Sequence, residues 1–249
     1  MPRNHRPGHG RADATDTRTT ATPGAGPGPA RTTVARTALT AVRRWITGAP
    51  GTYLWLAVLF VTTVVMHRMS PDFEEDFLRQ RSTNIHELSQ NPVRVLVSSA
   101  LWIDGGRWLP YAVLFTVFHA TAEHWLGTLR WLGVAAAAHI LATLVSEGVL
   151  AWAIRHGHAP QSALNTLDVG VSYALAGVIA VLTYRVRPPW RHVYAFAVLV
   201  FYGIPLVTGR TFTDLGHFTA VLIGLACYPL TRNPPGSRTA HKTKAPVAQ

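Results

Sequence analysis

The chain has 249 residues, of which 14% are charged and 48% apolar, so it lacks the polar cover that a soluble globule of this size needs. Its net charge is +11, but the basic residues cluster in both tails and in short loops between apolar runs. That distribution is typical of a membrane protein whose basic loops stay in the cytoplasm, and direct binding of nucleic acid is not expected. The single cysteine, Cys227, excludes a disulfide within the chain and a cysteine-based metal site.

The two ends of the chain differ in composition from its middle. Residues 1–45 are rich in Pro, Gly, Ala, Thr and Arg, and up to about residue 37 they hold almost no large apolar side chain. Such a segment cannot bury enough surface to fold, so we predict a disordered basic cytoplasmic tail that ends in a juxtamembrane stretch at 38–45. Residues 233–249 are predicted as a second disordered cytoplasmic tail, and residues 46–232 as one membrane domain.

The membrane domain contains six apolar segments, each near the length that a helix needs to cross the hydrocarbon. They run over residues 51–67, 108–127, 131–154, 169–184, 192–209 and 215–231. The predicted fold class is therefore an all-α membrane protein with six transmembrane helices. A further apolar stretch at 93–103 is too short to span, and we expect it to lie in the membrane interface.

The distribution of arginine predicts the orientation. With six crossings and a cytoplasmic N-terminus, the cytoplasmic side receives both tails and the short basic loops, which hold Arg130, Arg185, Arg187 and Arg191. We therefore expect a multi-pass protein with both termini in the cytoplasm and membrane lipids as partners. An Arg-, Ala- and Gly-rich chain with little Lys is compatible with a GC-rich bacterial genome, so the predicted location is a bacterial plasma membrane.

Two polar residues lie close to the starts of the fourth and sixth segments. Ser172 and His217 lie at matched depth if both segments cross in the same direction, and a serine and a histidine so placed can form a nucleophile–base pair. Small residues recur on both segments, at Gly170, Ala174 and Gly177 and at Gly216, Ala220 and Gly224. Small residues at that spacing let helix backbones approach closely, which favours contact between the two segments.

These residues carry a resemblance to a known family. Gly170-Val-Ser172 with Ala174 and Gly177 resembles the Gly-x-Ser-Gly nucleophile motif of the rhomboid intramembrane serine proteases. Gly216-His217-x-x-Ala220-x-x-x-Gly224 is similar to their sixth-helix pattern. The stretches Val93–Leu101 and Glu123-His-Trp-Leu-Gly127-x-x-Arg130 resemble the first loop and the junction of the second and third helices. The motifs occur in the family's order between about residues 51 and 232.

The resemblance implies a rhomboid-like bundle that hydrolyses membrane-protein clients. Ser172 is then the nucleophile and His217 the base, with no metal and no cofactor. The chain departs from the family pattern at Tyr173, where the second glycine of the nucleophile motif belongs. It also has Arg107 and Tyr111 where the family has the His and Asn that bind the oxyanion, and Leu101-Trp-Ile103 where it has Phe-Leu-His. Backbone groups at Gly170 and Val171, or Arg107 itself, are the candidate substitutes.

Two other functions use the same chain differently. A rhomboid-like pseudoprotease retains the fold and binds membrane clients without cutting them. A small transporter places ionisable groups on a path, for which His119, Glu123, His139 and Glu147 are the candidates. Asp168, one helical turn before Ser172, is expected to act as a helix cap, and His156 and His158 are expected to be solvated loop residues.

Overall fold

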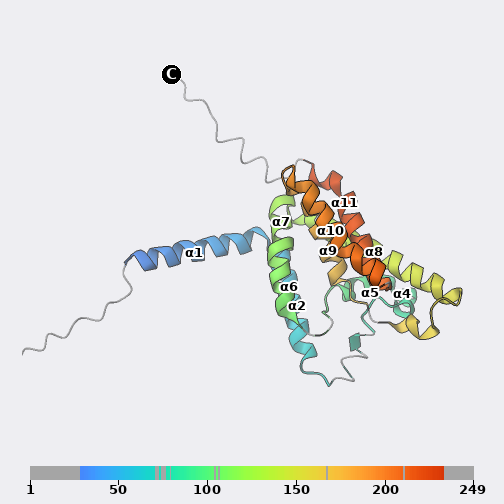
Figure 1. Ribbon diagram of the computed structural model, residues 1–249. Helices are drawn as coiled ribbons and strands as arrows, with labels where there is room; N and C mark the ends of the chain where they lie inside the picture. Colours follow the sequence, from blue (N-terminus) through green and yellow to red (C-terminus); the bar gives the residue numbers. More distant parts are fainter. Residues whose placement is uncertain are drawn as a thin grey trace, which may run out of the picture. The chain divides into compact units, whose positions relative to one another are not determined.

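The computed structural model describes residues 29–70, 73, 77–78, 80–103, 105, 107–166, 168–209 and 211–232 (Figure 1). Regular structure in these ranges is helical throughout, with no strand, which confirms the predicted all-helical class. The predicted C-terminal tail at 233–249 and the first 28 residues of the N-terminal tail lie outside the described ranges.

The chain divides into two compact units, Met1–Ala41 and Val42–Gln249. Helix α1, Pro29–Gly48, starts in the first unit and covers the last part of the predicted N-terminal tail, 1–45, whose disorder stays a prediction. The physical reason for this helix is local: no Gly or Pro interrupts the segment between residues 30 and 47, and Ala and Arg favour helix. At 100° per residue, Leu39, Val42 and Ile46 share one face of α1, with Arg43 at its edge and Arg44 on the opposite face.

Helices occupy each of the six predicted apolar segments. Along the chain they are α2 (Pro50–Met66), α6 (Trp108–Leu114), the π-helical turn η2 (Phe115–His119), α7 (Ala120–Leu126), α8 (Thr128–Arg155), α9 (Val171–Val181), η4 (Leu182–Arg185), α10 (Trp190–Thr208) and α11 (Phe212–Ala226). The first loop contains α4 (Ile85–Gln90) and α5 (Pro92–Ser99), the 3₁₀ turn η3 is Gln161–Asn165, and η5 is Tyr228–Thr231. The helix α5 coincides with the predicted short apolar stretch of the first loop.

Local sequence explains where several helices begin. Pro50 stands at the first position of α2, where its missing N–H costs no intrahelical bond. Thr211 and Asp214 form a reciprocal capping box at the start of α11, with the Thr211 hydroxyl accepting from the Asp214 N–H at 3.1 Å. Gly127 joins α7 to α8 with φ of +82°, a conformation that favours glycine.

The centre of the domain is the packing of α8, α9 and α11. A Cβ atom built on Gly224 of α11 would overlap the carbonyl oxygen of Gly177 on α9, and one built on Gly177 would overlap the Ala138 side chain of α8. These three helices therefore touch almost backbone to backbone. In Figure 1, α6 and α7 run as one rod beside α2, with which η2 also packs.

Many large apolar side chains face outward, as expected for a protein whose solvent is hydrocarbon. On α10 only Val198 is buried, whereas Phe196 and Phe201 are 69% and 70% exposed. By length and composition, two helices in the described ranges are able to span a membrane, α8 and α10, or three if the bent pair Arg36–Gly48 and Pro50–Met66 is one span. The predicted count of six is not confirmed, because α9 with η4 and α11 have 15 residues each, about 22 Å of helix.

Candidate functional site

The predicted nucleophile, Ser172, is the second residue of α9. Its hydroxyl donates to the backbone carbonyl of Val169, three residues earlier, at an Oγ–O distance of 3.4 Å. This is a local bond from a side chain to its own helix start, of the kind that serine forms when no other acceptor is offered. Within the ranges that the structure describes, no hydrogen bond joins Ser172 to His217, so the proposed dyad stays a prediction.

The predicted base, His217, lies half-buried on α11 between two tyrosine rings. The ring of Tyr173 meets it edge-on, with centroids 4.9 Å apart and planes at 77°. The ring of Tyr202 on α10 is stacked against it at 5.9 Å and 26°. Tyr202 in turn has Tyr111 of α6 as an electrostatic neighbour. The residue that α9 presents to His217 is therefore Tyr173, directly after Ser172.

The rotation of α9 about its axis explains this arrangement. Successive residues of an α-helix point about 100° apart, so Ser172 and Tyr173 point in different directions. Tyr173 is fully buried, and its ring lies over Gly216, where an added Cβ would collide with the phenol. The missing side chain at Gly216 thus makes the space that Tyr173 occupies beside His217.

Polar contacts hold the Tyr173 hydroxyl in place. It donates to the Asp168 carboxylate, at 3.0 Å from Oδ1 and 2.9 Å from Oδ2. The Thr83 hydroxyl donates to the Asp168 carbonyl at 3.1 Å, and the Thr83 N–H donates to the same carbonyl at 2.9 Å. Asp168 was expected to cap α9, but the N-cap is Gly170, and the carboxylate binds Tyr173 instead. The first loop is thereby tied to the start of α9.

Asp168 is 3% exposed, and burial raises the pKa of its carboxyl to about 6, against the hydrogen bonds from Tyr173 and Thr83, which act to lower it. Glu147 of α8 is a second carboxylate close enough to act on Asp168 electrostatically, and both of its oxygens are buried without a hydrogen-bond partner among the described residues. Two buried carboxyl groups therefore lie close to the phenol of Tyr173, whose ring contacts His217.

The candidate oxyanion residues have other surroundings. The ring of His139 on α8 packs on Gly170 so closely that any side chain at Gly170 would overlap it. A hydrogen bond of 2.8 Å joins His139 Nε2 to the Leu96 carbonyl of α5. Val171 is buried in an apolar cluster with Leu175, and Arg107 is an exposed residue at the N-cap of α6. No hydrogen bond in the described ranges connects Arg107 to Ser172 or His217.

Among the groups considered for transport, Glu123 has contacts that join helices. Glu123 is 1% exposed and accepts four hydrogen bonds, three from the start of α2 and one from Thr128 of α8. Its Oε1 accepts from the Gly51 N–H at 2.9 Å and from the Thr128 hydroxyl at 2.8 Å, and its Oε2 accepts from both the N–H and the hydroxyl of Thr52 at 2.7 Å. A carboxylate at a helix N-terminus is favourably placed for the helix dipole. Glu123 thus caps α2 from another helix.

The remaining histidines also have defined neighbours. His119 Nδ1 accepts from the Trp131 indole N–H at 3.0 Å, and its ring is stacked on Phe115 at 4.0 Å. The rings of His156 and His158 lie against Trp152, with centroid distances of 4.7 and 5.6 Å. In the described part of the chain, no three His, Cys, Asp or Glu residues gather in a way that would hold a metal ion.

In the sequence, Tyr173 is only a departure from the nucleophile motif, and Tyr202 is not predicted as a neighbour of His217. The available signal was that Tyr173 heads the run Tyr-Ala-Leu-Ala-Gly177, in which Tyr173 and Gly177 are one turn apart and share the packed face of α9. Tyr202 carries no such signal, because its contact with His217 joins two different helices.

Comparison with known proteins gives one match. A family model described as rhomboid-like protein matches residues 44–237, which is most of the chain. No match is found among the curated proteins or among the solved structures. The matched range contains both candidate dyad residues, the Glu123 junction and all the helices from α2 to α11, and it confirms the resemblance drawn from the motifs. The chain is a membrane protein of the rhomboid-like family.

Proposed function

We propose that this protein binds the transmembrane segments of other proteins without hydrolysing them, as a rhomboid-like pseudoprotease. The observation that carries the proposal is that the Tyr173 ring lies against His217 while the Ser172 hydroxyl donates to the Val169 carbonyl. A serine becomes a nucleophile when a base within about 2.6–3.2 Å accepts its proton. Here the Ser172 hydroxyl donates to Val169, and the ring next to His217 belongs to a residue that is locked by Asp168.

A fluorophosphonate probe on purified protein in detergent tests the chemistry. We expect labelling of the wild type no greater than that of Ser172→Ala, while a serine hydrolase added to the same sample is fully labelled. Thermal unfolding of the same preparation establishes that the protein is folded. Labelling of the wild type that disappears in both Ser172→Ala and His217→Ala would overturn the proposal and establish the predicted serine protease.

The outward face of α10 is the surface that we assign to clients. Phe196, Phe201 and Ile204 are between 56% and 70% exposed, and α10 buries little of itself against the rest of the domain. A photo-crosslinking residue at Phe196 should give adducts with membrane proteins. The matched control is Leu144 on α8, which is 46% exposed. Equal adducts from both positions would show that α10 has no preference for clients.

The proposal includes six crossings of a bacterial plasma membrane with both termini in the cytoplasm. Reporter fusions at Gly157, after α8, and at Pro188, before α10, should fall on opposite sides, with Gly157 outside. The arginines at 185, 187 and 191 support this orientation. Finding both reporters on the same side of the membrane would contradict this orientation and the prediction that Ser172 and His217 lie at the same depth.

A further inference from the structure

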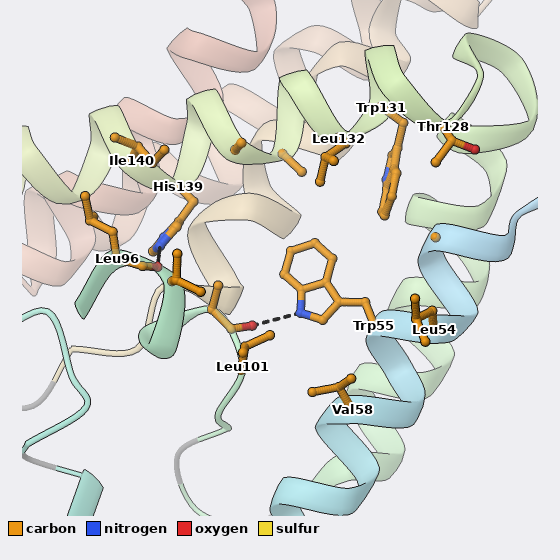
Figure 2. Close-up of a pocket in the computed structure, with 15 residues that line it drawn as sticks. Leu54, Trp55, Val58, Leu96, Leu101, Thr128, Trp131, Leu132, His139 and Ile140 are labelled. Atoms are coloured by element: carbon orange, nitrogen blue, oxygen red, sulfur yellow. Dashed lines mark hydrogen bonds between the residues drawn. The ribbon is translucent and has the colours of Figure 1, made fainter. Parts of the chain in front are cut away.

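A cavity of about 560 Å³ lies between α2, α5 and α8 (Figure 2). Helix α2 contributes Leu54 and Trp55, the α5 region contributes Val97 and Leu101, and α8 contributes Leu132 and Ile140. Four of these six side chains are between 36% and 69% exposed, namely Leu54, Val97, Leu132 and Ile140. The cavity is therefore open along its outer side rather than sealed in the core.

Aromatic side chains keep this cavity from closing. The Trp55 indole N–H donates to the Ala100 carbonyl at 2.8 Å, and Figure 2 shows this side chain reaching from α2 toward the backbone of the first loop. The Trp55 ring also meets the Trp131 ring of α8 with centroids 6.1 Å apart. Beyond these rings, α8 presents the small side chains of Ala135 and Ala136, which leave the space unfilled.

Three polar side-chain atoms of the lining, on Thr128, Trp55 and His139, have partners, whereas His139 Nδ1 is buried without one among the described residues. The Thr128 hydroxyl donates to Glu123, the Trp55 N–H donates to Ala100, and His139 Nε2 is bonded to the Leu96 carbonyl. A water molecule needs two to four polar partners, so the cavity favours an apolar occupant. Since α8 is long and apolar enough to span a membrane, that occupant is drawn from the surrounding lipid.

Two arginines lie at α5, which lines the cavity: Arg94 belongs to the helix, and Arg81 lies beside it with its guanidinium 3.5 Å from the Phe77 ring centroid. Arg94 is exposed and precedes the lining residue Val97 by three positions, so the two share a helix surface. Ser98, four residues after Arg94, donates to the Arg81 carbonyl at 3.1 Å, which brings Arg81 to the same helix. Burial and the neighbouring Arg94 charge both lower the pKa of Arg81. Two cations held this close are a favourable site for a phosphate group.

We propose that the cavity binds a phospholipid, with one acyl chain between α2, α5 and α8 and the phosphate at Arg81 and Arg94. The dimensions favour an acyl chain over a client helix. One turn of an α-helix with its side chains occupies roughly 400–600 Å³, so the whole cavity holds about one turn. An acyl chain has no such bulk, and it supplies contacts to lining atoms that an empty space would leave without partners.

Native mass spectrometry of the full chain in detergent, titrated with phosphatidylglycerol, tests the proposal. We expect one lipid per chain, and at least tenfold weaker retention in Ala136→Trp, which fills the cavity. The matched control is Ala197→Trp, at an exposed alanine of α10 outside the cavity, which should retain the lipid like the wild type. Leu132→Trp provides a second filling variant on the open side, in case Ala136→Trp unfolds.

Competition by two smaller ligands distinguishes the acyl-chain part of the site from the phosphate part. Lysophosphatidylglycerol, with one chain, should compete, whereas glycerol phosphate, with none, should not. The double variant Arg81→Gln/Arg94→Gln should weaken retention severalfold. Unchanged retention in both filling variants, or competition by glycerol phosphate, would overturn the acyl-chain site. Retention of a membrane protein that Ala136→Trp abolishes would assign the cavity to a client helix instead, and would also overturn it.

Discussion

On one side of α8 the helices touch backbone to backbone, and on the other side they stand apart around a cavity. Toward α9 and α11 the contacts are made by Ala138, Gly177 and Gly224, where no side chain longer than a methyl group fits. Toward α2 the contact is made by Trp55 and Trp131. Lipid tails are as apolar as leucine, so burial of apolar surface does not pull membrane helices together. Side-chain size therefore sets the separation on each side of α8.

The variant with the largest expected effect is Gly224→Leu, at the backbone contact between α11 and α9. The new side chain would meet the Gly177 carbonyl and the Ala180 Cβ, which is 2.9 Å from the position of a first added carbon. Backbone cannot move aside as a flexible side chain does, so we expect a loss of about 3 kcal/mol or more, or failure to fold. Thermal unfolding in detergent measures it. The matched control is Gly148→Leu on α8, where an added Cβ meets nothing within 4 Å. Equal loss in the two variants would contradict the close contact.

The second test removes the polar anchor that holds α2 at the end of the cavity. Glu123→Gln replaces an acceptor of four hydrogen bonds by an amide that accepts with one oxygen, and it removes the charge at the α2 N-terminus. Buried polar groups left unpaired cost about 1–3 kcal/mol, and we expect a loss of about 2–3 kcal/mol. Thr128→Val, which removes one of the four donors, should cost less. Unfolding at the wild-type temperature in Glu123→Gln would contradict the cap.

A third test concerns pH at the close contact. The folded state holds the Asp168 proton more tightly than the unfolded chain, because the pKa is about 6 in place of 3.8. The associated stability is fully present below about pH 4 and is lost as the pH rises through about 6, at roughly 3 kcal/mol in total. Asp168→Asn has no proton to lose. The difference in unfolding temperature between the wild type and Asp168→Asn should therefore change between pH 4 and 7, and a constant difference would contradict the shift.

The smallest expected effect is on the open side. Trp55→Phe keeps a ring in place but loses the hydrogen bond to the Ala100 carbonyl, for which we expect about 1 kcal/mol. Trp108→Phe is the control, since it loses a similar bond to the Leu56 carbonyl outside the cavity. Both variants should unfold slightly earlier, but Trp55→Phe alone should change phospholipid retention. A change of retention in both would show that the effect is not local.

Several features of this protein follow from its sequence alone. Long apolar runs determine the helical class, since backbone N–H and C=O groups in hydrocarbon must be paired within the segment. The motifs around Ser172, His217 and Glu123 were sufficient to identify the rhomboid-like family, which the match over residues 44–237 confirms. These are properties of composition and spacing, and they need no knowledge of which helix faces which.

Tertiary structure decided how those elements work together. The sequence predicts the same depth for Ser172 and His217 but carries no information on the rotation of α9 about its axis. That rotation is set by Tyr173, which lies over Gly216 and donates a hydrogen bond to Asp168. Likewise, nothing in the spacing of Glu123 pointed to its four donors, three of which belong to α2, some 70 residues earlier in the chain. The sequence of a helix determines which of its faces are apolar, whereas the side chains of neighbouring helices determine which residues come into contact. For that reason the cavity between α2 and α8, held open by Trp55 and the Ala100 carbonyl, exists only in the folded chain.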